Sequence, residues 1–318
     1  MKGYWLILPF ILLVLAGKAQ EDNEVFLFSF FTGNGEDGLH LASSEDGMNW
    51  KALRDNQSFL TPSVGKDKLM RDPCIIKGPE GKFHMVWTVS WREKGIGYAS
   101  SKDLIHWSEQ KYIPVMEHEP KARNCWAPEI FYDEASKQYI IFWSTTIPGR
   151  FPETEQPDEH NHRMYYVTTK DLKHFSETRL FYEQGFNVID GSLIKEDGQY
   201  VLFLKDETRY PPEKNIRIAT SHELTKNYSK PSEPITGDYW AEGPTPAKTG
   251  KYWVVYFDKY RKHSMGAVRS ADLENWEDIS DQVEFPKGTR HGIVFPITRT
   301  VFQTLKDIES MAEIRKIN

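Results

Sequence analysis

The sequence predicts an all-β protein, a five-bladed β-propeller in which N- and C-terminal strands share one blade. Three observations predict this fold. A short pattern recurs five times along the 318 residues, strand-like runs precede each copy, and the C-terminal segment has the character of the run that the first copy lacks. Repeats of roughly 50 residues with four short antiparallel strands each are typical of propeller blades.

The recurring pattern is an alternating apolar run, then Ser or Thr, an acidic residue and, three or four residues later, an aromatic residue. Its copies are "LHLASSEDGMNW", "IGYASSKDLIHW", "MYYVTTKDLKHF", "IRIATSHELTKNY" and "MGAVRSADLENW", which end at Trp50, Trp107, Phe175, Tyr228 and Trp276. The acidic side chains in these turns are predicted to be structural, because short polar side chains readily accept hydrogen bonds from nearby backbone.

Two further kinds of run complete each blade. The first, with strong β-propensity, precedes every copy: "EVFLFSFF", "KFHMVWTVS", "KQYIIFWST", "GQYVLFLK" and "KYWVVYFD". The second precedes only four copies: "RDPCIIKG", "WAPEIFYD", "IDGSLIKE" and "AEGPTPAK". The C-terminal "RHGIVFPITRT" supplies the missing run, which would close the ring and remove its open edge. Only "LKDIESMAEIRK" near the C-terminus resembles a helix.

The first residues resemble a secretory signal peptide over 1–19. Lys2 is followed by the apolar "YWLILPFILLVL" and a small-residue cleavage site near Ala19. Twelve apolar residues are too few to span a bilayer, and no cysteine follows them directly for lipid attachment. We therefore expect a periplasmic or secreted protein with one propeller domain over 20–318. Export would permit a Cys74–Cys125 disulfide, but two buried free thiols are favoured.

The formal charge of −6 argues against a nucleic-acid partner held through phosphates and against a basic membrane-docking surface. A neutral ligand and a monomeric protein are expected instead.

Acidic residues stand at equivalent points of the repeats. The innermost strands of the blades are predicted to start at or near Asp72, Glu129, Asp190, Glu242 and His291. Because innermost strands line the propeller axis, these side chains are expected to meet at one mouth, an arrangement that is unfavourable for stability alone. Loops on the same face carry Trp91, Trp126, Arg209 and Tyr260, which with His291 suit the ring faces and hydroxyl groups of a sugar.

The motifs at these strand starts resemble those of glycoside hydrolase family 43. They are Asp72-Pro73, Trp126-Ala127-Pro128-Glu129, Ile189-Asp190 and Glu242-Gly243-Pro244, in this order and one per repeat. His291-Gly292 matches the central histidine of many members. The resemblance extends from about Glu24 to Phe302.

The resemblance implies an inverting glycosidase in which two carboxyl groups act from opposite sides of the glycosidic bond. Asp72 would be the general base and Glu242 the general acid, with Asp190 modulating the acid and orienting it. Apolar neighbours of Glu242, including Trp240, would form a partly dry niche that keeps the acid protonated. Glu129 is expected to be structural or substrate-orienting.

No cofactor is required by this chemistry. The resemblance allows a structural calcium ion on the propeller axis, with His291 as a possible ligand, although calcium prefers oxygen ligands.

The sugar is left open between α-L-arabinofuranosides and β-xylosides, with a β-galactosidase or galactanase as the alternative. A non-catalytic sugar-binding propeller is a further alternative. A fructosidase would need Asn-Asp-Pro-Asn and Glu-Cys motifs that the sequence lacks, and the Asp-box of a sialidase would need one more residue than "SSEDGMNW" has.

Overall fold

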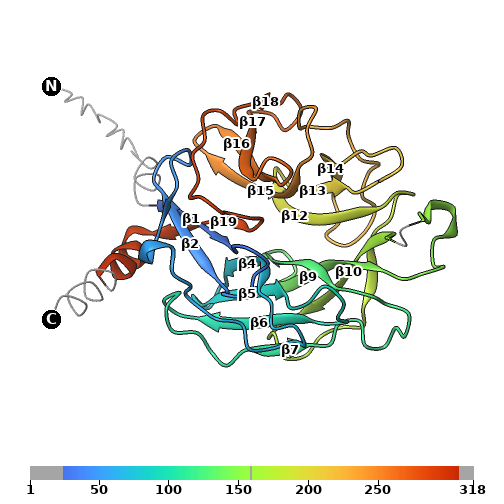
Figure 1. The fold of residues 1–318 in the computed structure, drawn as a ribbon, viewed down its shortest axis with the longest axis horizontal. Helices are drawn as coiled ribbons and strands as arrows, with labels where there is room; N and C mark the ends of the chain where they lie inside the picture. The colour runs from blue at the N-terminus through green and yellow to red at the C-terminus, as the bar shows by residue number, and fades with distance from the viewer. Residues whose placement is uncertain (1–23, 158–159, 308–318) are drawn as a thin grey trace, which may run out of the picture.

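The chain folds into five antiparallel β-sheets arranged as blades around one axis (Figure 1), which confirms the predicted five-bladed β-propeller. This computed structural model describes residues 24–157 and 160–307. The signal segment predicted over 1–19 lies outside the described residues.

The blades follow one another along the chain as strand meanders. The second blade contains β4 (Arg71–Lys77), β5 (Phe83–Thr88), β6 (Ile96–Ser101) and β7 (Lys111–Ile113). The third contains β8 (Trp126–Asp133), β9 (Gln138–Thr146), β10 (His162–Thr169) and β11 (Arg179–Tyr182). The fourth contains β12 (Val188–Glu196), β13 (Gln199–Asp206) and β14 (Asn215–Ser221). The fifth contains β15 (Glu242–Thr249), β16 (Tyr252–Lys259), β17 (Ser264–Ser270) and β18 (Glu277–Asp278).

The first blade joins the two ends of the described chain, as predicted. Its sheet order is β19 (Ile293–Thr298), β1 (Glu24–Phe30), β2 (His40–Ser44) and β3 (Lys51–Ala52). β19 pairs with β1 from Glu24↔Thr298 to Ser29↔Ile293. β19 thus becomes the innermost strand of the first blade, as β4, β8, β12 and β15 are in the others.

The fourth blade differs from the prediction because it has three strands rather than four. The segment after β14 still runs beside it, since the N–H groups of Ser229, Ser232 and Ile235 donate to carbonyls of β14. Pro231 and Pro234 interrupt this pairing, because proline has no N–H to donate to a regular ladder.

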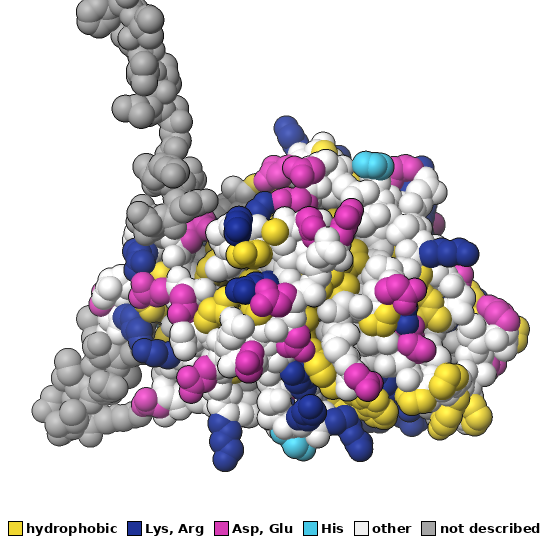
Figure 2. Space-filling view, turned by 90° about the horizontal axis from the view of Figure 1, so that it is seen from above, with side chains coloured by type: hydrophobic (Ala, Val, Ile, Leu, Met, Phe, Trp, Pro, Cys, Tyr) yellow, Lys and Arg dark blue, Asp and Glu magenta, His cyan; other side chains and the backbone are white. Residues whose placement is uncertain are grey.

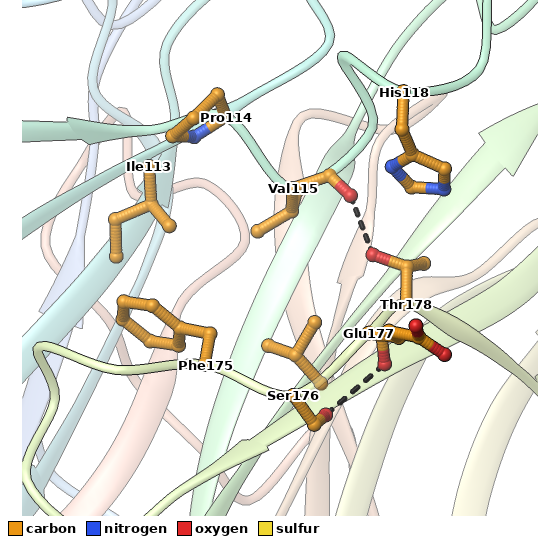
Figure 3. A pocket seen from close by; sticks show the side chains of 9 residues that line it. Ile113, Pro114, Val115, His118, Phe175, Ser176, Glu177 and Thr178 are labelled. Carbon is orange, nitrogen blue, oxygen red and sulfur yellow. Dashed lines mark hydrogen bonds between the residues drawn. The ribbon is translucent and has the colours of Figure 1, made fainter.

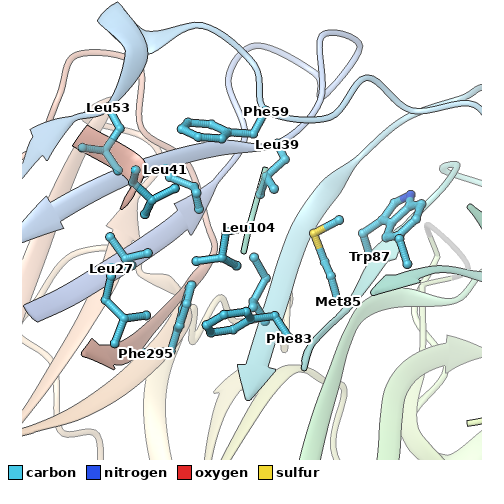
Figure 4. Packing of buried hydrophobic residues seen from close by; sticks show 14 of the residues in the cluster. Leu27, Leu39, Leu41, Leu53, Phe59, Phe83, Met85, Trp87, Leu104 and Phe295 are labelled. Atoms are coloured by element: carbon cyan, nitrogen blue, oxygen red, sulfur yellow. The ribbon is translucent and has the colours of Figure 1, made fainter. Parts of the chain in front are cut away.

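The core lies between adjacent blades. Figure 4 shows the contact between the first and second blades, where Leu27 and Leu41 face Phe83 and Met85. All four side chains are at most 1% exposed. The face-to-face packing of twisted sheets around the ring therefore fixes where each inner strand begins.

The predicted structural role of the acidic turns is confirmed. Asp103 Oδ1, for example, accepts hydrogen bonds from the N–H groups of Ile105 and His106 at 3.0 and 2.8 Å. Two short 3-10 helices, η2 (Arg54–Asn56) and η3 (Pro152–Thr154), lie in loops. A helix over 299–307 follows β19, so helical structure begins earlier than the sequence predicted. Cys74 and Cys125 are buried free thiols, as favoured from the sequence.

Within 24–157 and 160–307, no helix is both long enough and apolar enough to cross a membrane.

Candidate active site

Four of the five innermost strands start with the same irregularity, a β-bulge. The register shifts at the starts of β4, β8, β12 and β15. Each bulge contains one residue with positive φ: Asp72 at 52°, Ala127 at 45°, Asp190 at 53° and Gly243 at 63°. Bulges redirect side chains, and positive φ in residues other than glycine is unfavourable unless the surroundings enforce it. Both aspartates thus occupy constrained positions.

Glycine is required at position 243 by close approach as well as by φ. A Cβ there would lie 2.3 Å from the ring of His291. The Glu242-Gly243 motif therefore allows the histidine of the first blade to pack against the fifth blade.

The strand starts open into a cavity of about 660 Å³. All eight residues predicted as catalytic or substrate-binding line it: Asp72, Trp91, Trp126, Asp190, Arg209, Glu242, Tyr260 and His291. The expected convergence of side chains from separate blades is present.

Asp72 is held in its ionised form. Thr88 Oγ1 donates to its Oδ2 at 2.8 Å, and His291 Nδ1 lies 3.3 Å from its Oδ1. Burial alone would raise the pKa of Asp72, but His291, Arg71 and Thr88 lower it to about 2. A carboxylate with these properties can accept a proton from water.

His291 is the positive partner in this cluster. Burial alone would lower the pKa of His291, but the carboxylates of Asp72, Asp190 and Glu242 raise it to about 9. The imidazole is therefore charged at neutral pH.

Asp190 has the opposite character to Asp72. The N–H of Gly243 donates to its Oδ2 at 3.2 Å. Burial raises the pKa of Asp190, and the neighbouring carboxylates of Glu242 and Asp72 add to this effect, against His291 and Lys205. Asp190 is therefore fixed by the backbone N–H of Gly243, the residue that follows Glu242.

The surroundings of Glu242 differ from the dry, apolar niche that the sequence suggested. Its Oε2 accepts a hydrogen bond from Lys205 Nζ at 3.0 Å, and its Oε1 lies 3.4 Å from Arg290 Nη2. Ala241 is buried, but Trp240 is 37% exposed. The sequence interpretation was wrong here because both cations come from segments outside the Trp240–Pro244 stretch.

Lys205 was not predicted as a site residue. Its side chain is 2% exposed, and its Nζ lies 2.8 Å from Glu207 Oε2. Glu207 also pairs with Lys214 at 2.6 Å. One signal in the sequence could have indicated them. β13 ends in Lys205-Asp206 after an apolar run, and Glu207 follows directly, at the end of the blade that faces the cavity.

Aromatic residues surround the mouth of the cavity. Trp91, Tyr210 and Trp240 are 44%, 62% and 37% exposed. In the described residues, Leu180 is the only other large apolar side chain that is exposed to this degree. Trp91 is held by its indole N–H, which donates to Asn34 Oδ1 at 3.0 Å, and by Arg71, whose guanidinium lies 4.2 Å from the ring centre. Fixed, exposed ring faces of this kind suit sugar stacking.

Glu129 was expected at the same mouth, and this expectation was wrong, because Glu129 does not line the cavity. Its Oε2 accepts the N–H of Leu193 at 2.9 Å, and burial raises the pKa of Glu129 to about 8. The hydrogen bond links β8 to β12, which fits the structural role expected from the sequence.

In the described part of the chain, no group of three or more His, Cys, Asp or Glu side chains is arranged to hold a metal ion. His291 Nδ1 is directed to Asp72 instead. The axial calcium ion stays a prediction, and the chemistry proposed below uses none.

A second cavity, of about 520 Å³, lies between strands of the second and third blades (Figure 3). Its lining is mainly apolar, and Glu177 is its only carboxylic acid. It lacks the two carboxyl groups that glycoside hydrolysis needs.

A comparison with protein families decides the identity. The family described as "Probable glycosyl hydrolase domain", which is related to glycosyl hydrolase family 43, matches residues 21–302. The chain belongs to this family. The match confirms the resemblance seen in the strand-start motifs.

A curated relative of this chain is an α-L-arabinofuranosidase of Bifidobacterium longum subsp. longum. The two are 24% identical over 200 residues, which is 55% of this chain and 18% of that protein. The match therefore spans less than a fifth of the relative's length.

Solved structures show the same fold. An α-L-arabinofuranosidase from Lactobacillus brevis aligns with a TM-score of 0.52 and 18% identity, covering 66% of this chain and 72% of that chain. A thermostable family-43 glycoside hydrolase aligns with a TM-score of 0.51 and 17% identity, covering 66% of this chain and 71% of that chain. The catalytic domain of a family 62 α-L-arabinofuranosidase from Coprinopsis cinerea aligns with a TM-score of 0.52 and 13% identity, covering 73% of this chain and 75% of that chain.

On the face that Figure 2 presents, acidic side chains are spread among apolar and basic ones. The net charge of −6 is unfavourable for binding a polyanion.

Proposed function

We propose that this protein is an inverting exported glycosidase in which Asp72 is the general base and Glu242 the general acid. The observation that supports this most is that Asp72 and Glu242 come from the starts of different blades and line one cavity. Hydrogen bonds and the charge of His291 keep Asp72 ionised, as a general base requires. Glu242 lies in the same cavity as Asp190, which the N–H of Gly243 holds in place.

In the proposed reaction, Asp72 takes a proton from a water molecule as the water attacks the anomeric carbon. Glu242 donates its proton to the glycosidic oxygen as the bond to the leaving group breaks. Asp190, fixed by the N–H of Gly243, keeps the neighbouring Glu242 in line. The water, Asp72 and Glu242 together account for every proton that moves.

We propose α-L-arabinofuranosides as the first substrate class and β-xylosides as the second. The name of the Bifidobacterium relative supports the first choice. The exposed rings of Trp91, Tyr210 and Trp240 support a polymer or oligomer that extends beyond the cavity. A β-galactan is the alternative within the same fold.

The test is hydrolysis of aryl α-L-arabinofuranoside, β-xyloside and β-galactoside, and of the matching polysaccharides, by wild type, Asp72→Asn and Glu242→Gln. We expect turnover of one sugar class by wild type and losses of about 100-fold or more in both variants, on substrates with poor leaving groups. Binding of a glycan without turnover would establish a non-catalytic propeller instead. Unchanged turnover in either variant would reject its assigned role.

Export is proposed from the apolar segment of residues 4–15. N-terminal sequencing of the protein recovered from the periplasm or medium should place the first residue near position 20. An uncleaved N-terminus in the cytoplasm would contradict this.

A further inference from the structure

A row of alternating charges connects the candidate acid with the wall of the cavity. Glu242, Lys205, Glu207 and Lys214 follow one another with separations of 3.0, 2.8 and 2.6 Å between their charged atoms. The exposed fractions of the side chains are 20%, 2%, 7% and 6% in the same order. The row is therefore mostly removed from solvent.

Such a row is unfavourable as a device for stability alone. Burying an ammonium group loses several kcal/mol of hydration, which is regained only if its partners are well placed. Lys205 has two carboxylate partners, and its Nζ also lies 4.6 Å from the centre of the Tyr260 ring. Burial alone would lower the pKa of Lys205, but the carboxylates of Glu242 and Glu207 raise it well above its usual range.

The row joins Glu242 to elements that face a substrate. Glu207 also lies 3.4 Å from Arg209 Nη2, and Lys214 Nζ donates to the carbonyl of Glu207 at 3.1 Å. The N–H of Ala241, directly before Glu242, donates to the carbonyl of Lys214 at 2.9 Å. The 207–214 loop is thereby tied to both the side chain and the backbone around Glu242.

Lys205 poses a specific problem for an acid catalyst. A general acid must be neutral when it donates its proton, and Lys205 then loses the charged partner that lies 3.0 Å from its Nζ. Glu207 offers a solution, because it lies on the other side of Lys205 at a similar distance. Lys205 can keep a carboxylate partner when Glu242 becomes protonated.

We infer that Lys205 is a positioning residue that holds Glu242 in the cavity and keeps its pairing with Glu207 while Glu242 carries the proton that it donates. This inference rests on the proposed role of Glu242 as the general acid. Lys205 acts only through Glu242, so its removal should impair protonation of the leaving group and leave water activation by Asp72 intact.

The first test compares leaving groups. Wild type and Lys205→Met are assayed on glycosides of the accepted sugar with a dinitrophenyl or a methyl leaving group. A dinitrophenolate leaves without protonation, so only the methyl glycoside depends on the acid. We expect kcat/KM of Lys205→Met to fall about tenfold further on the methyl glycoside. Equal losses on both substrates would overturn the inference.

Lys195→Met is the matched control. Lys195 lies on β12, forms an ion pair with Asp133 at 3.2 Å and does not line the cavity. Its substitution should leave the ratio of the two rates unchanged. If Lys205→Met fails to fold, Glu207→Gln replaces it: this variant confines Lys205 to Glu242, and it too should lose more rate on the methyl glycoside than on the dinitrophenyl glycoside.

The second test does not need turnover. The positions of Glu242 and its nearest cation are compared in crystal structures of wild type and Lys205→Met. Glu207→Gln is used instead if Lys205→Met is unfolded. In Lys205→Met, we expect the Glu242 side chain to leave its present position. In Glu207→Gln, we expect Lys205 to bind Glu242 alone. In both variants, Asp72 should not move. An unchanged arrangement would overturn the inference, whereas a wild type that hydrolyses no glycoside would overturn the proposed function only.

Discussion

His291 Nδ1 lies 3.3 Å from Asp72 Oδ1, so the segment before β19 and the start of β4 meet as a partly buried ion pair. The contact joins the blade that closes the ring to the blade that supplies the candidate base. This ion pair should therefore affect both the stability of the protein and the ionisation of the candidate base.

The stability of the protein should depend on this pair in a defined pH window. The folded pKa of His291, about 9, exceeds its ordinary value of 6.5, so its contribution is complete below pH 6.5 and lost as pH rises through 9. The folded pKa of Asp72, about 2, lies below 3.8, so its contribution is complete above pH 3.8 and lost as pH falls through 2. The pair therefore stabilises most between about pH 4 and 6.5.

His291→Asn tests this window. In urea unfolding at pH 5.5, 7.5 and 9.5, the free-energy difference between wild type and variant should shrink as pH rises. A difference that is the same at all three values would show that the charge of His291 does not contribute.

Glu129→Gln should stabilise the protein at alkaline pH. Folded Glu129 keeps its proton up to about pH 8, whereas the unfolded chain loses it near 4.5. The folded state thus binds more protons, and the free energy of unfolding falls by about 1.4 kcal/mol per pH unit between these values. Glutamine removes this slope and can still accept the N–H of Leu193.

The measurement for Glu129→Gln is the free energy of unfolding at pH 5, 6.5 and 8. At each step to higher pH, the free energy of unfolding of the variant should rise relative to that of wild type. A constant difference would mean that Glu129 is ionised in the folded protein.

Thr88→Val should impair catalysis through Asp72. Thr88 Oγ1 donates to Asp72 Oδ2 at 2.8 Å and accepts the N–H of Ala127 at 2.8 Å, so it links two strand starts. Valine has the same shape but neither hydrogen bond. We expect kcat to fall about tenfold with little change in KM, and the free energy of unfolding to fall by about 1–3 kcal/mol. Thr88→Ser keeps the hydroxyl and should restore both, and failure of this rescue would exclude the hydrogen bonds as the cause.

Trp91→Ala should weaken substrate binding. Trp91 is 44% exposed at the mouth of the cavity and is fixed by Asn34 and Arg71. Loss of a stacking platform worth about 1 kcal/mol raises KM roughly fivefold, with a smaller change in kcat. Leu180→Ala, which removes an equally exposed side chain outside the cavity, is the control. Equal effects of the two substitutions would contradict the binding role of Trp91.

The sequence predicted the propeller and the meeting of its acids because both follow from a repeated local pattern. Asp72, Asp190 and Glu242 lie at the bulged starts of innermost strands, and the fold brings these strand starts to one axis. The ion pairs of Glu242 do not follow from the repeat. Lys205 and Arg290 occupy unrelated points of their blades, and only the packing of blades against each other determines that both reach one carboxylate.

The fourth blade shows the same limit. The repeat predicts an outer strand after β14, yet Pro231 and Pro234 prevent a regular ladder there. A pattern of apolar residues indicates where a strand could lie, whereas its hydrogen bonds depend on single residues.

The stereochemistry of the first-formed product tests the central claim most directly, namely that Asp72 activates a water molecule across the sugar from Glu242. Proton NMR during the first minutes of hydrolysis, before mutarotation, distinguishes the two anomers. The account predicts a product whose anomeric configuration is inverted relative to the substrate. A retained configuration would show that a carboxylate attacks the sugar itself, and would contradict the role assigned to Asp72.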